Sequence, residues 1–502
     1  MAEKTLKVKG KDDLNKSLFT KDEDVNKSIY GADQMDVIGK SMSAGYGISP
    51  ETQHDGGALR PESLDRDIKQ ETWSTQDFTI FNDIARQPSR STVEKYIVYY
   101  DHGKVGHERF QPEVGIGNQT QPSLDQKTVN MKYLAATSQT SMVLQHSNVV
   151  ADPIAVQEMG AINVLAKTIE WAIFYGDADL TRQEAGQGLQ FDGLSKLIDK
   201  GNIIDVRGKG ISPSLLNKAA VMIGKRGFGT ATDAYMPIGI QADFVNKYLG
   251  AQRVVLPTQD GMQAGMNVDS FLSTRGRIRL NGSTIMDLDN VLDESKRPSQ
   301  GAPLAPSVEA EVVSDQGGQF LAEDVVEGDN KHVVVPAEVG KDLKYRVVAV
   351  GHNGDSMPSD VISAKPANAT DGIKLTITLD ALSSEAPEYF AIYRQSLIDD
   401  ENGDFYLVGR VAGNKLNGNQ VEFVDTDDTI AGTADIFVLQ NDAQVLNLFE
   451  FLPMTKLPLA VVTNATSFSV LWQGALRLSF PKRVVRIKNV HYATGDDEFK
   501  FC

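Results

Sequence analysis

Apolar residues recur at helical spacing along the segment that leads to Gly176. The recurring positions are Ile162, Leu165, Ile169, Ala172 and Ile173. Asp152 is a good N-cap residue, Pro153 suits the first helical position, and Gly176 is a typical stop. These signals predict a helix over residues 153 to 175, roughly 35 Å long at about 1.5 Å per residue. A helix of this length is expected to act as the spine of the domain around it.

Two segments with period-two alternation lie before this helix. Residues 93 to 100 (VEKYIVYY) and 127 to 134 (KTVNMKYL) are predicted strands, with Val129, Met131 and Tyr133 on one face of the second. The 26 residues between them are rich in Gly and Pro, and a connection of that length in a compact domain is usually functional or disordered. The pattern predicts an extended hairpin arm that reaches away from its own core.

Helical and strand patterns alternate after the spine helix. They predict a helix over residues 212 to 225, a buried strand over 235 to 240, a helix over 241 to 249, and a second helix-and-strand group over 443 to 487. GKRGFG (residues 224 to 229) follows the first of these helices, so we interpret it as a C-cap and turn rather than a phosphate-binding loop. The alternation favours a mixed α/β domain whose sheet is completed by the C-terminal group.

A different pattern interrupts this domain after the linker GAPLAPS (residues 301 to 307). Seven or eight short β patterns follow, separated by Gly, Asn, Asp and Pro, and they include SVEAEVV, LKYRVVAV, IKLTITL, YFAIYRQ and FYLVGRV. Short strands at this spacing are typical of a small β-sandwich. Residues 345 to 360 (YRVVAVGHNGDSMPSD) resemble the strand-turn-strand of fibronectin type III and related immunoglobulin-like domains, with Tyr345, Val347 and Ala349 facing inward.

The net charge of -17 is concentrated in the same segment. Residues 303 to 440 contain 24 acidic residues against 9 Lys and Arg, a net charge of -15, which leaves -2 for the rest of the chain. This division indicates a separate module that faces solvent.

Composition excludes several classes of protein. Cys502 is the only cysteine, so neither a disulfide framework nor a cysteine-rich metal site can form within one chain. No apolar run approaches the roughly 18 residues that cross a bilayer, and the N-terminal segment lacks the apolar core of a signal peptide, so we expect a cytoplasmic origin. Residues 1 to 44 are polar and are interpreted either as a mobile tail or as a transient helix or removable leader.

Motifs typical of catalysis, cofactor binding and metal binding are not found in the sequence. The seven histidines lack the paired spacing of a zinc helix, and there is no GxSxG elbow and no P-loop. We therefore predict no catalytic, cofactor-binding or metal-binding residues. The basic run PKRVVRIK fits either weak contact with nucleic acid or pairing with acids in a subunit interface. Its cations are Lys482, Arg483, Arg486 and Lys488.

Together these features resemble one family, the major capsid proteins of tailed bacteriophages with the Hong Kong 97-type fold, and in particular those of the Twort-like contractile-tailed phages. The segments that carry the resemblance are GYGISPETQHDGGALR (45 to 60), TIEWAIFYGD (168 to 177), GQGLQFDGLSKLID (186 to 199), FGTATDAYMPIGIQADFVN (228 to 246), LFEFLPMTKLPLA (448 to 460), LWQGAL (471 to 476) and RIKNVHY (486 to 492). They cover most of residues 45 to 492 outside the insert.

The resemblance implies an α+β fold with an N-arm, an extended loop, a peripheral domain built on the spine helix and an axial domain, interrupted by an all-β immunoglobulin-like sandwich. The implied boundaries are 1 to 44 for an N-terminal extension, 45 to 92 for the N-arm, 93 to 134 for the extended loop, 135 to 188 for the peripheral domain, 189 to 302 for the first part of the axial domain, 303 to 440 for the acidic insert, and 441 to 502 for the C-terminal part of the axial and peripheral domains.

The resemblance also implies a function. The chain would self-assemble as pentamers and hexamers into an icosahedral head that encloses double-stranded phage DNA, and it would be made in the host cytoplasm and reside in the virion. It would need no cofactor and catalyse no reaction. Expected partners are further copies, a portal, a scaffold and a maturation protease, with non-specific proximity to DNA and no membrane. The acidic insert would face outward, because an inward face would repel packaged DNA.

Small residues at Ser41, Ser43 and Ala44 mark a candidate junction at which a protease removes the N-terminal extension. Two alternatives stay open at the level of sequence. One is a phage tail or surface adhesin in which the sandwich is the binding part. The other is an enzyme whose catalytic residues converge only in space.

Overall fold

The computed structural model describes residues 78 to 491 apart from short internal stretches. The stretches left out are 102 to 109, 112, 116 to 122, 148 to 151, 183 to 187, 250 to 254, 259 to 260, 265 to 267, 289, 294 to 296, 300, 327 to 332, 381 to 382, 384, 399 to 402 and 461 to 463. The chain divides into two compact units, Met1–Lys69 and Gln70–Cys502. The first unit lies wholly outside the described residues, and every described helix and strand belongs to the second.

The predicted spine helix is confirmed as α5 (Pro153–Tyr175). Its N-cap is Asp152, whose side chain accepts a hydrogen bond from the amide of Ile154 at 3.0 Å, and Pro153 occupies the first turn, where no amide donor is needed. At the other end, the Gly176 amide donates to the Ala172 carbonyl at 2.9 Å. The buried face begins at Ala161, so Ile162, which the helical spacing placed on that face, is exposed instead.

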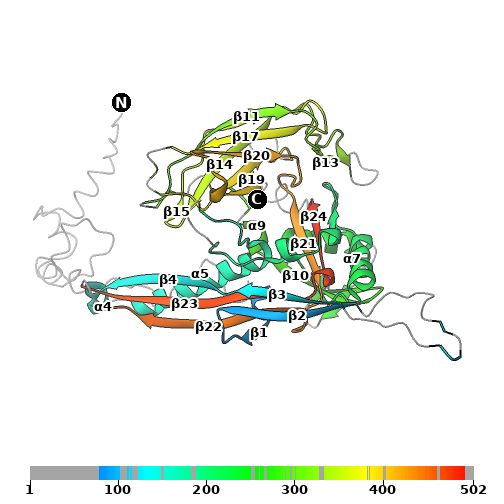
Figure 1. Cartoon of the computed structure of the whole chain (residues 1–502), viewed down its shortest axis with the longest axis horizontal. Coiled ribbons are helices and arrows are strands. Elements are labelled where there is room, and N and C mark those ends of the chain that lie inside the picture. The colour runs from blue at the N-terminus through cyan, green and yellow to red at the C-terminus, as the bar shows by residue number, and fades with distance from the viewer. Residues whose placement is uncertain are drawn as a thin grey trace, which may run out of the picture. The chain divides into compact units, whose positions relative to one another are not determined.

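A four-stranded sheet lies along this helix, as Figure 1 shows, with strand order β1-β22-β23-β4. The strands are β1 (Ala85–Pro88), β22 (Leu446–Pro458), β23 (Ala465–Leu478) and β4 (Lys132–Ser141). β1 is parallel to β22, and the other pairs are antiparallel. Trp472 on β23 shares one hydrophobic core with Ile169 and Ile173 of α5. The sheet therefore joins two strands from the N-terminal part of the described chain to two strands from its C-terminal part, beside the spine helix.

The predicted hairpin is present, but its second strand is divided at Met131. β2 (Val93–Asp101) and β3 (Ser123–Asn130) form an antiparallel pair, and β4 begins at Lys132 with β23 as its new partner. Met131 and Lys132 are both buried, so the alternation of inward and outward side chains slips by one residue. The expectation that Tyr133 shares a face with Val129 and Met131 is therefore wrong, and Tyr133 is exposed.

A second, six-stranded sheet has the order β5-β24-β21-β6-β10-β9. Its strands are β5 (Ile203–Asp205), β24 (Val484–Val490), β21 (Ala434–Leu439), β6 (Asp233–Pro237), β10 (Gly276–Ser283) and β9 (Ser270–Ser273). The helices α7 (Pro213–Gly227) and α8 (Ile238–Leu249) pack on it. Leu216, Ile223, Ile240 and Phe244 from these helices are fully buried in a core that they share with the strands. The predicted mixed domain, closed by a C-terminal strand, is confirmed.

Three predicted elements of this domain are corrected. The strand expected over 235 to 240 ends at Pro237, whose nitrogen cannot donate to a neighbouring strand, and α8 begins at once. No α-helix is present in the described part of the segment 443 to 487, where β22 and β23 form a long antiparallel pair and η6 is a single helical turn. β21, which falls inside the range 303 to 440 expected for the insert, pairs with β6 and β24 of the six-stranded sheet.

Residues 307 to 425, here called the β insert, form two main sheets. One has the order β11-β17-β20, and the other has β15-β14-β18-β19 with β16 beside β14. The strands are β11 (Ser307–Val313), β14 (Leu343–Gly351), β15 (Gly354–Asp355), β16 (Ile362–Ala364), β17 (Gly372–Thr378), β18 (Tyr389–Gln395), β19 (Phe405–Ala412) and β20 (Gln420–Asp425). Tyr345, Val347 and Ala349 are buried as predicted, and they share a core with Leu375 and Ile377 of the other sheet.

The remaining short elements connect or border these sheets. They are α3 (Ile80–Asp83), α4 (Met142–His146), α6 (Leu194–Leu197), α9 (Ile285–Leu288), the single turns η4 (Lys200–Asn202), η5 (Gly413–Lys415) and η6 (Pro481–Arg483), and the two-stranded pairs β7 (Val255–Thr258) with β8 (Gly261–Ala264) and β12 (Val325–Val326) with β13 (Val333–Val335).

Two glycines make the sharp turn after the spine helix possible. The Gly193 amide donates to the Gly176 carbonyl at 2.8 Å, which draws the two backbones together. A Cβ on Gly176 would lie 2.4 Å from the Phe191 carbonyl oxygen, and one on Gly193 would lie 2.6 Å from the Ala172 carbonyl oxygen. Since φ of Gly176 is -58°, the turn requires the absence of a side chain there, and not a left-handed backbone.

Candidate functional site

A cluster of buried charges lies inside the β insert and extends to Asp427, just past its C-terminal end. Arg394 on β18 is fully buried, and its guanidinium lies 3.0 Å from Glu338, 2.9 Å from Asp425 and 2.6 Å from Asp427. The Tyr345 hydroxyl donates to Asp425 at 2.8 Å. Although burial alone would lower the pKa of Arg394, the three carboxylates raise it well above its ordinary value. One guanidinium against three carboxylates leaves an excess of negative charge in the interior of the insert.

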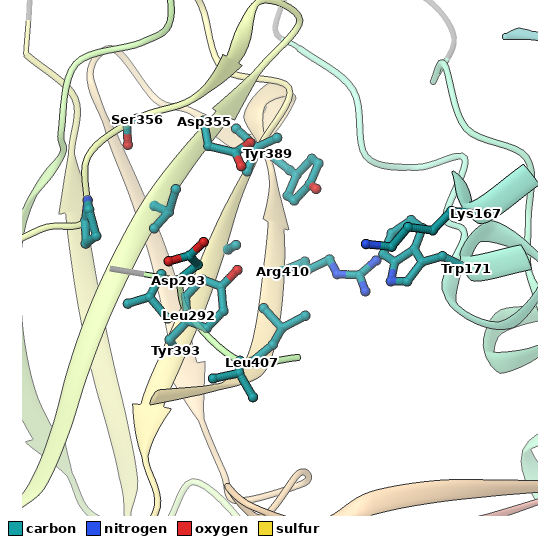
Figure 2. A pocket seen from close by; sticks show the side chains of 15 residues that line it. Lys167, Trp171, Leu292, Asp293, Asp355, Ser356, Tyr389, Tyr393, Leu407 and Arg410 are labelled. Atoms are coloured by element: carbon teal, nitrogen blue, oxygen red, sulfur yellow. The ribbon is translucent and has the colours of Figure 1, made fainter. Parts of the chain in front are cut away.

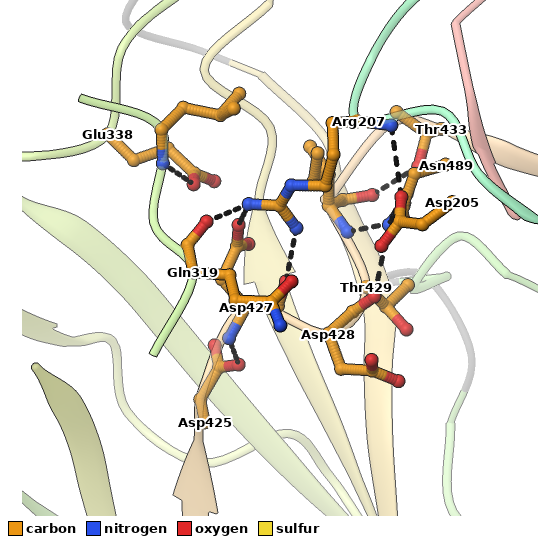
Figure 3. Close-up of polar contacts among 12 residues, drawn as sticks. Asp205, Arg207, Gln319, Glu338, Asp425, Asp427, Asp428, Thr429, Thr433 and Asn489 are labelled. Carbon is orange, nitrogen blue, oxygen red and sulfur yellow. Dashed lines mark hydrogen bonds and ion pairs between the residues drawn. The ribbon is translucent and has the colours of Figure 1, made fainter. Parts of the chain in front are cut away.

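Arg207, from the six-stranded sheet domain, supplies a second cation to this cluster (Figure 3). It lies in a tight turn after β5, with φ of +50°, and its amide donates to Asp205 at 3.0 Å. Its guanidinium donates to the Asp427 carbonyl and to the Asp427 carboxylate, both at 2.7 Å, and also contacts the Gln319 carbonyl. Burial raises the pKa of Asp427, so a neighbouring cation is needed to keep its charge.

Arg410 and Asn414 join the β insert to the end of the spine helix. The Arg410 guanidinium donates to the Tyr175 carbonyl at 3.0 Å and stacks 4.7 Å from the centre of the Trp171 ring. The last turn of α5 contains no basic residue of its own, so Arg410 supplies the positive charge that a helix C-terminus favours. Asn414 donates to both the carbonyl and the hydroxyl of Thr181, each at 2.8 Å. A side chain of the insert therefore caps the C-terminal end of α5, a helix that lies outside the insert.

A cleft of about 520 Å³ lies between α5 and the five-stranded sheet of the insert (Figure 2). Lys167 and Trp171 line its helix side, and Tyr389 and Tyr393 lie on the insert side. Within the described part of the chain, no group of three or more His, Cys, Asp or Glu is placed to hold a metal ion. Aromatic and charged side chains from α5 and from the insert thus face each other across the cleft.

Glu170 fastens the first described residues to the spine helix. Its carboxylate is fully buried and accepts hydrogen bonds from the Thr79 amide at 3.0 Å, the Thr79 hydroxyl at 2.9 Å, the Ile80 amide at 3.2 Å and the Phe81 amide at 2.8 Å. Burial raises the pKa of Glu170, against the opposing effect of these donors. A single side chain of α5 thus satisfies the free amides of α3.

Two of the four predicted basic residues pair with acids of the same chain. Arg486 lies 2.7 Å from Asp435, and Lys488 lies 3.3 Å from Asp205 and also contacts Asp428. These pairs lie on β24 and beside the turn that leads out of the β insert. The Arg486 pair therefore joins β24 to β21 within the six-stranded sheet, and Lys488 lies at the junction between the insert and that sheet.

The other two basic residues lie on η6, which packs against the end of α7. The Arg483 side chain donates to the Gly227 carbonyl at 3.0 Å and stacks on the Phe480 ring, and the neighbouring Lys482 is exposed. The basic run thus divides between two places and does not form one patch.

The β2–β3 hairpin exposes apolar side chains on one of its faces. Val98 on the opposite face is buried, and the Tyr96 hydroxyl there donates to the Leu478 carbonyl at 3.2 Å. On the outer face, Ile97 is 71% exposed and Leu124 is 59% exposed. The outer face of the hairpin therefore presents apolar side chains to its surroundings.

Known relatives match nearly the whole chain. It is 45% identical over 471 residues to the major capsid protein of Staphylococcus phage K, an alignment that covers 93% of this chain and 98% of that protein. The major capsid protein of Staphylococcus phage S25-3 matches with the same identity and coverage. The chain belongs to the family of phage major capsid proteins. Because the alignment includes most of the β insert, the insert is a regular part of such a capsid protein, and the alternative of a tail protein or adhesin is wrong.

Other comparisons add less to this assignment. No family model matches the capsid protein. Among solved structures, the capsid of an empty GTA particle is 10% identical with a TM-score of 0.42, covering 88% of this chain and 99% of that one. The capsid of Myoviridae Phage XM1 is 8% identical with a TM-score of 0.39, covering 86% and 97%.

Membership in this family suggests a structural role and a place in the virion. None of the helices in the described ranges is both long enough and apolar enough to cross a membrane. The candidate junction at Ser41, Ser43 and Ala44 lies outside the described residues.

Several residues that organise this capsid protein were missed by the sequence analysis. Glu170 left a signal, because helical spacing puts this acid beside Ile169 and Ile173 on the apolar face, where a charge requires partners. Arg207 and Arg394 left none, since their acidic partners are distant along the chain.

Proposed function

We propose that this capsid protein self-assembles as pentamers and hexamers into the icosahedral head that encloses double-stranded phage DNA. The observation that carries this proposal is the 45% identity, over 93% of the chain, to proteins named major capsid protein. The exposed face of the β2–β3 hairpin, with Ile97 and Leu124, supports it physically. Obligate interfaces commonly bury about 2,000 Å² or more, and an arm laid on a neighbouring copy supplies such area without enlarging the core.

We further propose the Hong Kong 97-type fold for this chain. In that arrangement α5 and the four-stranded sheet form the peripheral domain, the β2–β3 hairpin is the extended loop, and the six-stranded sheet with α7 and α8 is the axial domain. β21 then belongs to the axial domain, so the insert ends before Ala434. Two sheets around one core support an immunoglobulin-like or fibronectin-like sandwich for the insert.

We place the insert on the outer surface of the head. The segment from 303 to 440, which contains the insert, carries a net charge of -15, and this supports the placement because packaged DNA repels an acidic wall. A maturation protease would remove residues 1 to 44, and a portal and a scaffold would complete the set of assembly partners. A structural role of this kind involves no catalysis and no cofactor.

Electron microscopy of the purified full-length chain tests the proposal. We expect rings or closed shells for the wild type, and a map of the shell should place the β insert outside. Ile97→Asp should abolish assembly without unfolding the subunit, because it places a charge in the hairpin contact. Val424→Asp, a change of equal chemistry at an exposed position on β20, is the matched control and should assemble normally. A wild-type chain that stays monomeric under all conditions contradicts the proposed function.

A further inference from the structure

Phe228 combines two features that a subunit on its own does not favour. It follows α7 with φ of +54° and ψ of +27°, in the left-handed region where glycine is the usual residue at a helix end. Its side chain is also 82% exposed, so the ring gains little from burial within the chain. Both features would favour glycine at this position if only the fold of the subunit mattered.

The turn that presents Phe228 is held rigidly against η6. A Cβ on Gly227 would lie 2.5 Å from the Lys482 carbonyl oxygen, so the backbone there is in close contact with that turn. The Arg483 side chain donates to the Gly227 carbonyl at 3.0 Å and fixes the same contact. Gly229 is buried, and a Cβ there would lie 2.5 Å from the Gln440 side-chain oxygen. The backbone that carries the aromatic ring is therefore preorganised, which lowers the entropy cost of binding.

The surroundings of the ring indicate the kind of surface that it meets. Lys225, in the last turn of α7, and Lys482, on η6, are both exposed. A complementary surface would offer carboxylates around an apolar centre. Outside residues 303 to 440 the chain still contains 43 acidic residues, so another copy can supply such carboxylates, whereas a DNA duplex offers phosphates but no apolar pocket along its backbone.

We propose that Phe228 is a fixed apolar anchor that inserts into an apolar pocket with an acidic rim on a second copy of this chain. Rings of identical subunits are closed by contacts in which one surface meets a different surface of the next copy, so a knob and its pocket belong to the same sequence. Buried aromatic anchors at the centre of such contacts contribute much of the binding. The inference rests on the proposed assembly of the chain and names one contact within it.

The Phe228→Gly variant tests whether the aromatic ring serves assembly or the stability of the subunit fold. We expect the thermal midpoint of the subunit to stay unchanged or rise, since glycine prefers this backbone conformation, while the protein concentration required for assembly rises at least tenfold. Met357→Gly, which removes an exposed apolar side chain from a loop of the β insert, is the control and should assemble as the wild type does. Light scattering and sedimentation measure assembly, and calorimetry measures the midpoint.

The outcomes are distinguishable. If the wild type forms no assemblies, the proposed function fails. If the wild type and Phe228→Gly assemble at the same concentration, the anchor is refuted while the proposed function stands. If Phe228→Gly lowers the thermal midpoint, the ring serves the subunit fold and the proposal is overturned.

Photo-crosslinking identifies what the ring touches. Benzoylphenylalanine replaces Phe228 with an aromatic side chain that crosslinks on illumination. Assembled particles should yield crosslinked pairs of this chain, and unassembled subunits should not. Crosslinks to DNA or to a different protein would overturn the assignment of the partner.

Discussion

The guanidinium of Arg207 lies 2.7 Å from the carboxylate of Asp427, a side chain that is fully buried at the junction between the β insert and the six-stranded sheet. Asp427 also contacts Arg394, but that residue already faces two other carboxylates. The buried carboxylates at this end of the insert therefore depend on Arg207, a cation from the six-stranded sheet domain, to balance their negative charge.

Replacing Arg207 by Gln should destabilise the β insert by about 3 kcal/mol, because removing one partner of a buried ion pair leaves the other charge uncompensated. Hydrogen exchange should show faster opening of β18 and β20 than of α5. Lys374→Gln, which breaks a more exposed pair with Glu422, is the control and should cost less than about 1 kcal/mol. Equal losses in the two variants would contradict the role assigned to Arg207.

Because burial raises the pKa of Asp427, the Arg207→Gln variant should regain stability as the pH is lowered. An acid whose pKa is raised by folding binds its proton more tightly in the folded state, so its contribution to stability is present at low pH and lost as the pH rises. Denaturation of the variant at several pH values measures this. A variant whose deficit grows on acidification would argue against a charged Asp427 as the cause.

Gly176→Ala should destabilise the subunit by about 3 kcal/mol, since its Cβ would overlap backbone carbonyls that cannot move aside. Gly160→Ala in the spine helix provides the opposite case. Among the described residues, nothing lies within 4 Å of a Cβ at that position, so removing a glycine from the helix interior should stabilise the subunit by about 1 kcal/mol. Denaturant midpoints measure both changes, and equal shifts in one direction would refute the steric explanation.

Glu170 should make the stability of the subunit depend on pH. Its pKa is raised above its ordinary value of 4.5, so its contribution is present in full below that pH and is lost as the pH rises through the folded-state pKa. The stability of the wild type minus that of Glu170→Gln should therefore decrease between about pH 4 and pH 7. Denaturation at both pH values gives the two differences. A difference that increases with pH would show that the four donors outweigh burial.

Mass spectrometry of subunits from mature particles should show that residues before the Ser41 to Ala44 region are missing. Removal at that position is expected from the family resemblance and from the small side chains there. An intact terminus at Met1 or Ala2 in mature particles would rule out the cleavage.

The spine helix could be predicted almost to the residue because its signals are local. Asp152, Pro153 and Gly176 act within one turn of the helix ends, and no distant partner can shift them. The burial of Tyr345, Val347 and Ala349 was predicted for a similar reason, since strand alternation is a local pattern.

Errors arose where distant partners decide the structure. The slip at Met131 occurs because β4 leaves β3 and pairs with β23, which is more than three hundred residues away in the sequence. The predicted C-terminal helix failed because β22 and β23 stabilise each other across a long ladder. The contact between Arg207 and Asp427 was missed for the same reason, since the two residues are 220 positions apart in the sequence.

One short stretch of α5 binds two segments that are far apart in the sequence. Glu170 accepts hydrogen bonds from the backbone of Thr79 to Phe81, and five residues later the Tyr175 carbonyl accepts one from Arg410 of the β insert. A force that pulls on the insert would thus reach the N-terminal segment through this stretch of helix, without passing through either large sheet.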